Sequence, residues 1–358
     1  MNSTVHEHPG VYSSYDASSI LSGANAGKTV GVAAIAAEGD TGEVVLLHSY
    51  AEAVEAFGED AANAPGMATV VKLLLANGAG TVKAVAVDVD AEDDTADYES
   101  AFALLGEEED IGIMVCDSAS ASVHAQLRSA VAEASGLRRE RIAVVGGSGE
   151  TVAQMISHAQ GINHERVVLV GPDVTMEDGR EVSAVFAAAA VAGLIASGSD
   201  VSVPINGAPL ALIKGVSTHL SDTEVDSLVR GGVTALECVN GVCSPIRGVT
   251  TKTTSGGVND ATWRELTTIL IVDDVIPSIR NAIRARFVRS KNTAQTRGAI
   301  RSQVVLELEE KLTREMIDAY GDVSVSAMED NPTVCLVEFG FTVAHGLNRV
   351  YLTAHITV

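Results

Sequence analysis

The chain has 358 residues, of which 46% are hydrophobic, and it carries 47 Asp or Glu against 24 Lys or Arg, a net charge of −23. A chain of this length exceeds the size at which one hydrophobic core keeps growing, so two domains are expected, and the apolar content excludes a largely disordered chain. Such a negative charge disfavours nucleic acid and anionic membranes as partners.

No targeting or membrane segment is evident. The N-terminal residues contain no basic region followed by an apolar run, so no signal peptide is predicted. The nearest membrane candidate, AVFAAAAVAGLIA at 184–196, has 13 residues, whereas a bilayer needs ~20. We therefore expect a buried helix there, and synthesis and folding in the cytoplasm.

The first part of the chain alternates between strand and helix patterns. Residues 29–37 (TVGVAAIAA) predict a buried strand, EVVLL predicts a second, and a helix capped by Ser49 and Glu52 ends at Gly58. The pattern then repeats, with helices at 66–76, 96–105, 120–135, 150–160 and 182–197 and strands at TVKAVAV, IGIMVC, RIAVV and RVVLV. Because the strands are continuously apolar, helices should cover both faces of a mostly parallel sheet, which predicts a doubly wound α/β domain over residues 26–245.

That domain should end in a capped helix and a hairpin. Ser221 and Glu224 form a second capping box, and Gly231 ends the helix that they open. The segment VTALECVNGVCS predicts a hairpin whose turn is Asn240 and Gly241, a dipeptide suited to a type I′ turn.

A smaller α+β domain with an antiparallel sheet is predicted over residues 246–345. IRGVTTKTT predicts a strand, and ELTTILIV a strand that runs into a helix. Pro277 should lie in the first turn of that helix, with Asp273 or Asp274 as its N-cap. A longer helix follows, with apolar residues every four positions from Ile300 to Met316. Three closing strands are expected at VSVSA, TVCLVEFGFTV and RVYLTAHITV.

Two glycine-rich loops invite a phosphate-binding interpretation. GANAGKT at 23–29 has one residue too few between its glycines for a P-loop, and a strand follows where a helix is needed. GGSGET at 146–151 lies between a strand and a helix, where doubly wound folds bind phosphates, but it lacks the third glycine. A tight turn is favoured there, and a nucleotide- or phosphate-binding enzyme using residues 146–151 is the alternative function.

Cysteine and histidine form no recognisable site in the sequence. The four cysteines (Cys116, Cys238, Cys243 and Cys335) fit no metal-binding spacing and are predicted to be reduced thiols. His6 and His8 are expected at the surface, and His124, His158, His164 and His219 occur singly. We therefore predict no catalytic residue, no metal and no cofactor.

Basic residues are concentrated near the C-terminal end. From Ile246 onward there are 13 basic and 13 acidic residues, which leaves 24 − 13 = 11 basic and 47 − 13 = 34 acidic before it. Between Ile276 and Leu306 no acidic residue occurs, while seven basic ones do: Arg280, Arg284, Arg286, Arg289, Lys291, Arg297 and Arg301. The alternatives are a solvated helix face, a surface that docks on an acidic partner and a nonspecific nucleic-acid-binding surface. The acidic partner is favoured, because the rest of the molecule would repel nucleic acid.

The chain ends in an alternating strand pattern. Val350, Leu352, Ala354, Ile356 and Val358 alternate with more polar residues such as Tyr351 and Thr353. Such a strand either completes its own sheet or adds to the sheet edge of a neighbouring subunit.

Taken in order, these segments resemble the tail sheath proteins of contractile phages and related bacteriocins and injection systems. HPGVY at 8–12 is similar to the family's opening motif, and GKTVGVAAIAAEGDTGEVVLLHSYAEAVEAFG to its first βα unit. PINGAPLAL, GGVTALE, IRGVTTKTT, DATWREL, VDDVIPSIRNAIRARFVRSKNT and TRGAIRSQV follow the family's order and spacing.

The resemblance implies a structural protein with no enzymatic activity. It implies an N-terminal arm (1–25), an outer α/β domain of subtilisin-like shape without a protease triad, an inner domain, and a C-terminal arm strand (346–358). Subunits would form stacked six-fold rings around an inner tail tube. Arm residues Pro9, Gly10, Val11 and Tyr12, together with the C-terminal strand, would join neighbouring subunits, and the seven basic residues would face the tube. Further partners would be baseplate and tail terminator proteins. Contraction from a metastable extended state would drive the tube through the target envelope and allow genome ejection, with no nucleic acid bound and no direct membrane insertion.

Overall fold

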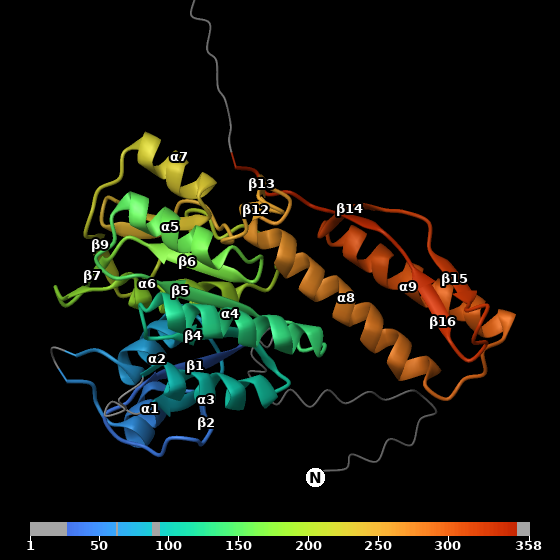
Figure 1. Ribbon diagram of the computed structural model, residues 1–358, viewed down its shortest axis with the longest axis horizontal. Coiled ribbons are helices and arrows are strands. Elements are labelled where there is room, and N and C mark those ends of the chain that lie inside the picture. Colours follow the sequence, from blue (N-terminus) through green and yellow to red (C-terminus); the bar gives the residue numbers. More distant parts are fainter. Residues whose placement is uncertain (1–26, 62–63, 88–93, 349–358) are drawn as a thin grey trace, which may run out of the picture.

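The computed structural model describes residues 27–61, 64–87 and 94–348, and it contains an α/β body and an elongated lobe that projects from it (Figure 1). We call residues 27–270 the body and residues 271–343 the lobe. The body contains one eight-stranded sheet with the strand order β11-β10-β6-β5-β4-β1-β3-β2. The six inner strands run parallel, and the edge strands β2 and β11 are antiparallel to their neighbours. The predicted α/β class with a mostly parallel sheet is confirmed.

The strands of this sheet are β1 (Thr29–Ile35), β2 (Val45–Leu47), β3 (Val82–Val87), β4 (Ile111–Cys116), β5 (Ile142–Gly146), β6 (Val167–Gly171), β10 (Val233–Val239) and β11 (Val242–Pro245). The helices of the body are α1 (Tyr50–Phe57), α2 (Met67–Ala76), α3 (Asp94–Glu107), α4 (Ala121–Gly136), α5 (Val152–Ile162), α6 (Ala184–Ser197) and α7 (Asp222–Arg230). A three-stranded sheet of β7 (Val174–Met176), β8 (Glu181–Val182) and β9 (Ile213–Val216) and a small hairpin of β12 (Thr254–Ser255) and β13 (Val258–Asn259) complete the body.

Helices cover both faces of the sheet because its strands are apolar on both sides. Val30 and Val32 of β1 belong to a hydrophobic cluster with α1, α2 and α6, whereas Ala33 belongs to the cluster on the opposite face, with α3, α4, α5 and α7. Helix α6, rich in alanine, approaches α2 closely: a Cβ atom at Gly193 would lie 2.5 Å from the carbonyl oxygen of Leu74. Small side chains thus let the helices on one face pack tightly.

Local capping signals are confirmed. The Ser49 side chain accepts a hydrogen bond from the backbone N–H of Glu52, and Ser221 and Glu224 form the predicted reciprocal box at α7. The hairpin between β10 and β11 turns at Asn240 and Gly241, whose φ angles of 52° and 80° suit a type I′ turn.

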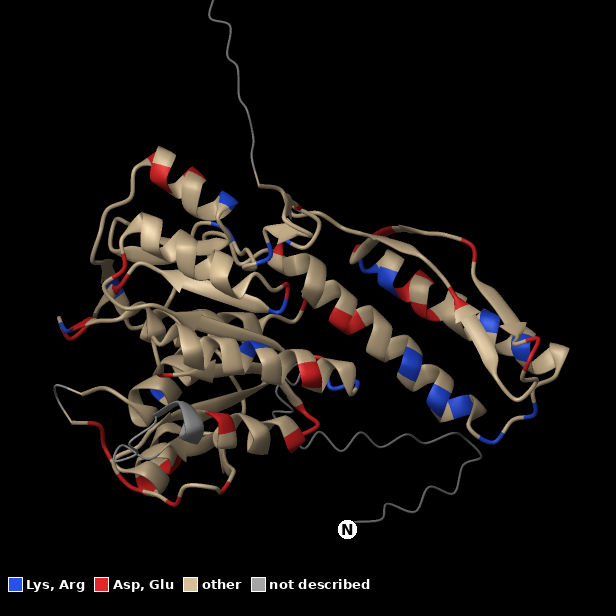
Figure 2. Ribbon diagram, in the orientation of Figure 1, with Lys and Arg blue, Asp and Glu red and all other residues tan. Residues whose placement is uncertain are grey.

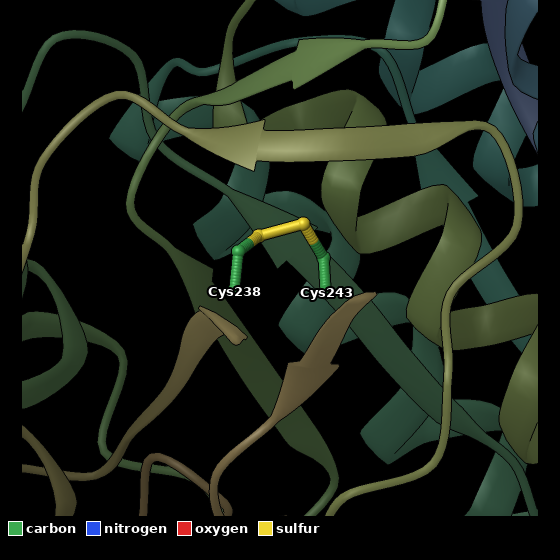
Figure 3. The surroundings of a disulfide bond; sticks show 2 residues. All are labelled: Cys238 and Cys243. Atoms are coloured by element: carbon green, nitrogen blue, oxygen red, sulfur yellow. A yellow bond between two sulfur atoms is a disulfide. The ribbon is translucent and has the colours of Figure 1, made fainter. Parts of the chain in front are cut away.

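The prediction of four reduced cysteines was wrong for two of them. Cys238 and Cys243 lie directly opposite each other on β10 and β11 and are joined by a disulfide (Figure 3). The two-residue turn brings them together, with Cα atoms 4.0 Å apart. Spacing alone does not reveal the pair, because the pairing depends on the register of the two strands across the turn. Cys116 and Cys335 are free.

The start of the long helix α8 (Leu266–Phe287) was also wrongly predicted. ELTTILIV is helical almost from its start, the N-cap is Glu265 in place of Asp273 or Asp274, and Pro277 lies inside the helix. Residues from Leu266 to Ile271 are all buried, and a short run buried on every side cannot be assigned to strand or helix by periodicity. The strand expected at IRGVTTKTT is absent from residues 246–253, apart from an isolated bridge between Val249 and Glu265.

The lobe consists of α8 beyond Leu270, α9 (Ala294–Thr313) and four short strands. These strands, β14 (Ile317–Tyr320), β15 (Ser324–Ala327), β16 (Cys335–Glu338) and β17 (Phe341–Val343), form two separate two-stranded sheets, β14–β17 and β15–β16, where a single antiparallel sheet was expected. Strand β14 was not predicted. The closing strand at 349–358 and the N-terminal arm lie outside the described residues.

The hydrophobic clusters change over within α8. Leu266, Ile269 and Leu270 belong to a cluster of the body, whereas Ile271, Val275 and Ile279 belong to that of the lobe. Helix α8 therefore connects the two parts as one continuous element, and the domain boundary predicted between residues 245 and 246 stays a prediction. Over the ranges that the structure describes, no helix is long and apolar enough to cross a membrane.

Candidate assembly surface

The seven predicted basic residues lie on the outer half of α8, in the loop after it and on the first turns of α9 (Figure 2). Four of them have partners within the chain. Arg280 forms an ion pair with Glu140, Arg286 donates to Gln303 Oε1, Arg297 donates to Asn292 Oδ1 at 3.0 Å, and Arg301 donates to the carbonyl of Val323 at 2.8 Å.

The other three basic residues of the segment are Arg284, Arg289 and Lys291. All are exposed, and none of their side chains makes a hydrogen bond or ion pair with a described residue. Their charges are therefore available to an acidic surface outside the chain. The basic segment thus divides into residues that hold the fold together and residues that are free to bind.

Buried ion pairs fix α8 to its surroundings. Arg166, next to β6, binds Asp273 with both terminal nitrogens, at 2.6 and 2.9 Å, and the Asp273 side chain is only 4% exposed. Burial raises the pKa of Asp273, against the opposing effect of Arg166. Two helical turns later, Arg280 forms a bidentate ion pair with Glu140. Burial alone would raise the pKa of Glu140, but the hydrogen bonds from Arg280 contribute to a pKa that is lowered overall. Lys311 of α9 pairs with Asp274.

The Arg166–Asp273 and Arg280–Glu140 pairs hold one face of α8 against the body. Asp273 and Arg280 are seven residues apart, which places them on the same side of the helix. The fixed geometry leaves the outer half of α8 projecting beyond the body (Figure 1).

A groove separates the end of α4 from the outer half of α8. It has a volume of about 890 Å³, and its lining includes Leu137, Arg138, Arg139, Arg280, Ile283, Arg284, Phe287 and Val288. We call these residues the basic groove. Leu137 is 65% and Val288 is 72% exposed, so the groove combines apolar and mostly positively charged surface, with Glu109 as an acidic residue in its lining.

Two arginines of the basic groove, Arg138 and Arg139, were not among the predicted residues. Arg139 donates to the carbonyls of Gly106 and Glu107 at the end of α3, and the buried Arg141 donates to Leu105 and Glu108 there. Such donors satisfy the free carbonyls at a helix C-terminus. The Arg138 backbone N–H donates to the carbonyl of Ser135, but its side chain makes no hydrogen bond or ion pair with a described residue. The dense basic run LRRER at 137–141, within an otherwise acidic part of the sequence, is the signal that could have revealed them.

The two small sheets of the lobe leave open strand edges. Each strand of the β14–β17 and β15–β16 pairs has a single neighbour among the described strands. A two-stranded pair is marginally stable without further strands or packing. The predicted arm residues, Pro9–Tyr12 and Val350–Val358, lie outside the described residues, so the structure does not place them.

The alternative phosphate site at 146–151 is lined by acid. Glu150, Asp173 and Glu224 border a cavity of about 590 Å³ at this loop, and three carboxylates disfavour a phosphate. Asp173 accepts from the N–H groups of Gly149 and Ala184, each at 2.8 Å, which explains the loop as a tight turn. Gly146 is required there, because a Cβ atom would lie 2.2 Å from the carbonyl oxygen of Ala184.

Two histidines that are far apart in sequence meet in the body. His124 Nδ1 lies 2.9 Å from His158 Nε2, and His158 Nδ1 lies 2.7 Å from Glu150 Oε1. The other nitrogen of His124 is 2.8 Å from the carbonyl of Ser118. Burial, and then the neighbouring His158, lowers the pKa of His124 to about 4. This contact could not be predicted from the sequence, where the two histidines occur singly, because it depends on α4 and α5 lying side by side.

Comparison with known proteins identifies the domains. Residues 91–250 match the phage tail sheath protein central domain, and residues 258–357 match the phage tail sheath C-terminal domain. The tail sheath protein of Bacillus phage SP01 is 29% identical over 250 residues, which cover 68% of this chain and 43% of that protein. The chain therefore spans less than half the length of this curated relative.

Solved structures share the fold. The sheath tail protein from Desulfitobacterium hafniense superposes with a TM-score of 0.70 at 12% identity, over 93% of this chain and all of that one. The helical sheath of the anti-feeding prophage in its contracted state gives a TM-score of 0.72 at 16% identity, over 98% and 99% of the two chains. A chain of the anti-feeding prophage baseplate gives 0.75 at 16% identity, over 99% and 100%.

Proposed function

The chain belongs to the phage tail sheath protein family, and we propose that it is a structural subunit of a contractile tail sheath. In this proposal subunits polymerise as stacked six-fold rings around an inner tail tube, and contraction from a metastable extended state drives the tube through the target envelope. The observation that carries the proposal is the pair of two-stranded sheets in the lobe, whose open edges are suited to strands from neighbouring copies.

Strand addition would connect the subunits. The backbone groups along a free strand edge bind an incoming strand through hydrogen bonds, and alternating side chains set the register. Val350, Leu352, Ala354, Ile356 and Val358 provide such an alternation, and Pro9–Tyr12 would contribute from the other terminus. Links of this kind would hold a mesh together while the bodies rotate as rigid units.

Docking on the tube would use the free charges of the outer half of α8 and of the loop after it. Arg284, Arg289 and Lys291 are exposed, and Arg138 and Arg284 line the basic groove. Exposed charge pairs each contribute about 0–1 kcal/mol, so several of them give a contact that holds before firing and yields during it. The four paired residues of the basic segment would instead maintain the shape of the lobe.

The remaining expectations follow the same proposal. Baseplate and tail terminator proteins would be further partners, assembly would take place in the host cytoplasm, and the subunit would act mechanically, without catalysis. The division into an outer domain at 26–245 and an inner, tube-facing domain at 246–345 belongs to this proposal as well.

Assembly of the purified chain tests the proposal. We would express the full chain, a variant ending at Gly346, and a full-length control in which Thr353→Ser leaves the apolar face of the terminal strand unchanged. Negative-stain electron microscopy and sedimentation should reveal hollow tubes or rings for the full chain and the control, and dispersed particles for the truncation. Dispersed globules from all three at high concentration would contradict the sheath proposal.

A further inference from the structure

Three arginines from separate parts of the chain surround a small cavity at one end of the body. Arg230 ends α7, Arg247 follows β11 and Arg264 precedes α8. Together with Asp226 and Val229 they line a cavity of about 210 Å³. In a chain of net charge −23, this concentration of positive charge is unusual.

Two of the three arginines have acidic partners. Arg247 binds Glu265 through Nε and Nη2, and both side chains are largely buried. Arg230 lies 3.4 Å from Asp226, in a pair that is well exposed to solvent. Within each pair, the acidic side chain therefore offsets most of the charge of its arginine.

Arg264 has no such partner. Its backbone is held firmly, because its N–H donates to the carbonyl of Ala261 and its carbonyl accepts from the N–H of Thr250. Its side chain forms no hydrogen bond or ion pair with any residue in the described ranges, and its Nε atom is buried and unsatisfied. A guanidinium stays charged at every accessible pH, and a charge partly removed from water needs a partner.

The size of the cavity restricts what that partner can be. Cofactor pockets typically measure ~300–1,000 Å³, so a nucleotide or a flavin does not fit. A single carboxylate or phosphate group does, and the planar guanidinium fork is suited to bind its oxygens. The formal charges of the five charged side chains around the cavity, three Arg against Asp226 and Glu265, sum to +1.

We propose that Arg264, supported by Arg247 and Arg230, forms an oxyanion site that takes a carboxylate side chain of a second copy of this chain in the assembled sheath. The 47 acidic residues of each copy supply such groups in excess, and a cavity of about 210 Å³ has room for the end of one such side chain. The identity of the oxyanion as a carboxylate of a second copy rests on the proposed function, whereas the oxyanion site itself does not.

The site is tested first on the full chain at a concentration at which it is dispersed. Inorganic phosphate should raise the melting temperature of the wild type above that in chloride of equal ionic strength. Arg264→Gln keeps hydrogen-bond donors but removes the charge, and it should abolish the phosphate-specific shift. Arg314→Gln removes an equal charge from an exposed position at the end of α9 and should leave the shift unchanged. Equal phosphate shifts in the wild type and Arg264→Gln would overturn the site.

Assembly then identifies the source of the oxyanion. We expect Arg264→Gln to raise the concentration required for polymerisation about tenfold, as the loss of one charge-assisted contact per interface implies, and Arg314→Gln to have little effect. If Arg264→Gln polymerises like Arg314→Gln while the phosphate shift is lost, the site binds free oxyanions and the second-copy carboxylate is refuted. If the wild type fails to polymerise, the proposed function fails, and the phosphate measurement still decides the site.

Discussion

Every residue of β5 and β6 in the body is buried, whereas no residue of β15 or β16 in the lobe is. The body closes both faces of its sheet with its own helices. The lobe has a cluster of eight buried residues among those described, surrounded by half-buried ones such as Phe339 and Phe341. This difference suggests that the body folds as a complete unit and that the lobe reaches its final packing with neighbours.

The largest expected effect contrasts two glycines in helices. Gly193→Val in α6 places a side chain against the backbone of α2, and we expect a loss of more than about 3 kcal/mol of unfolding free energy. Gly298→Val in α9 meets open space and should change stability by less than about 1 kcal/mol. Chemical denaturation of the dispersed protein measures both. Similar losses at the two positions would contradict the tight packing between α2 and α6.

The next effect concerns the connection between body and lobe. Arg166→Met leaves Asp273 buried without its partner and should cost about 3–5 kcal/mol, while adding Asp273→Leu should recover most of that loss. Arg280→Met breaks a pair in which the arginine is more exposed and should cost about 1 kcal/mol. Thermal unfolding of the four proteins provides the comparison. A double variant as unstable as Arg166→Met would show that the pair is not the cause.

Matched leucines test the two cores directly. Leu127 in α4 and Leu308 in α9 are both fully buried. Leu127→Ala should cost about 4 kcal/mol, because the body cannot relax around a cavity, whereas Leu308→Ala should cost about 2 kcal/mol, since the lobe can. Denaturant titration below the assembly concentration gives both values, and a larger loss at Leu308 would reverse the comparison.

The last comparison is a pH dependence of two buried groups in the body. The folded pKa of His124 is about 4, below its unfolded value of ~6.5, so the unfolded chain binds the proton first as the pH falls. Its contribution is complete above pH ~6.5 and is lost progressively toward pH 4, by up to about 3 kcal/mol. Asp117 acts in the opposite direction, because burial raises its pKa to about 6.

Variants separate these two groups. The difference in unfolding free energy between the wild type and His124→Gln should shrink from pH 7.5 to pH 4.5. Over the same range, the wild type should gain unfolding free energy relative to Asp117→Asn. Urea titrations at several pH values measure both gaps. A gap that does not change with pH for His124→Gln would contradict the lowered pKa of that histidine.

Much of the body could be predicted from the sequence because its signals are local. Continuous apolar strands, the capping boxes at Ser49 and Ser221, and the Asn240–Gly241 turn each depend on a few adjacent residues. The sequence did not predict the helical state of ELTTILIV, because a segment buried on all sides carries no periodicity. Pro277 misled the prediction of the helix start for a second reason: the tertiary contacts of α8 offset the free-energy cost of a proline inside a helix.

The candidate surface was predicted only in part, for a related reason. The run of basic residues from Arg280 to Arg301 is visible in the sequence, but which of them are free depends on partners such as Glu140 and Val323, far away in the chain. Arg138 and Arg284 line the same groove only because the end of α4 lies beside α8. Contacts between distant segments also explain why the His124–His158 pair was missed.

Hydrogen exchange before and after assembly tests most directly whether neighbours complete the lobe. Backbone N–H groups on the outer edges of β15 and β16 should exchange rapidly in the dispersed protein and become protected in the polymer, while those of β5 and β6 should be protected in both. We expect at least a tenfold slowing of exchange, confined largely to the lobe. Unchanged exchange at β15 and β16 after polymerisation would contradict it.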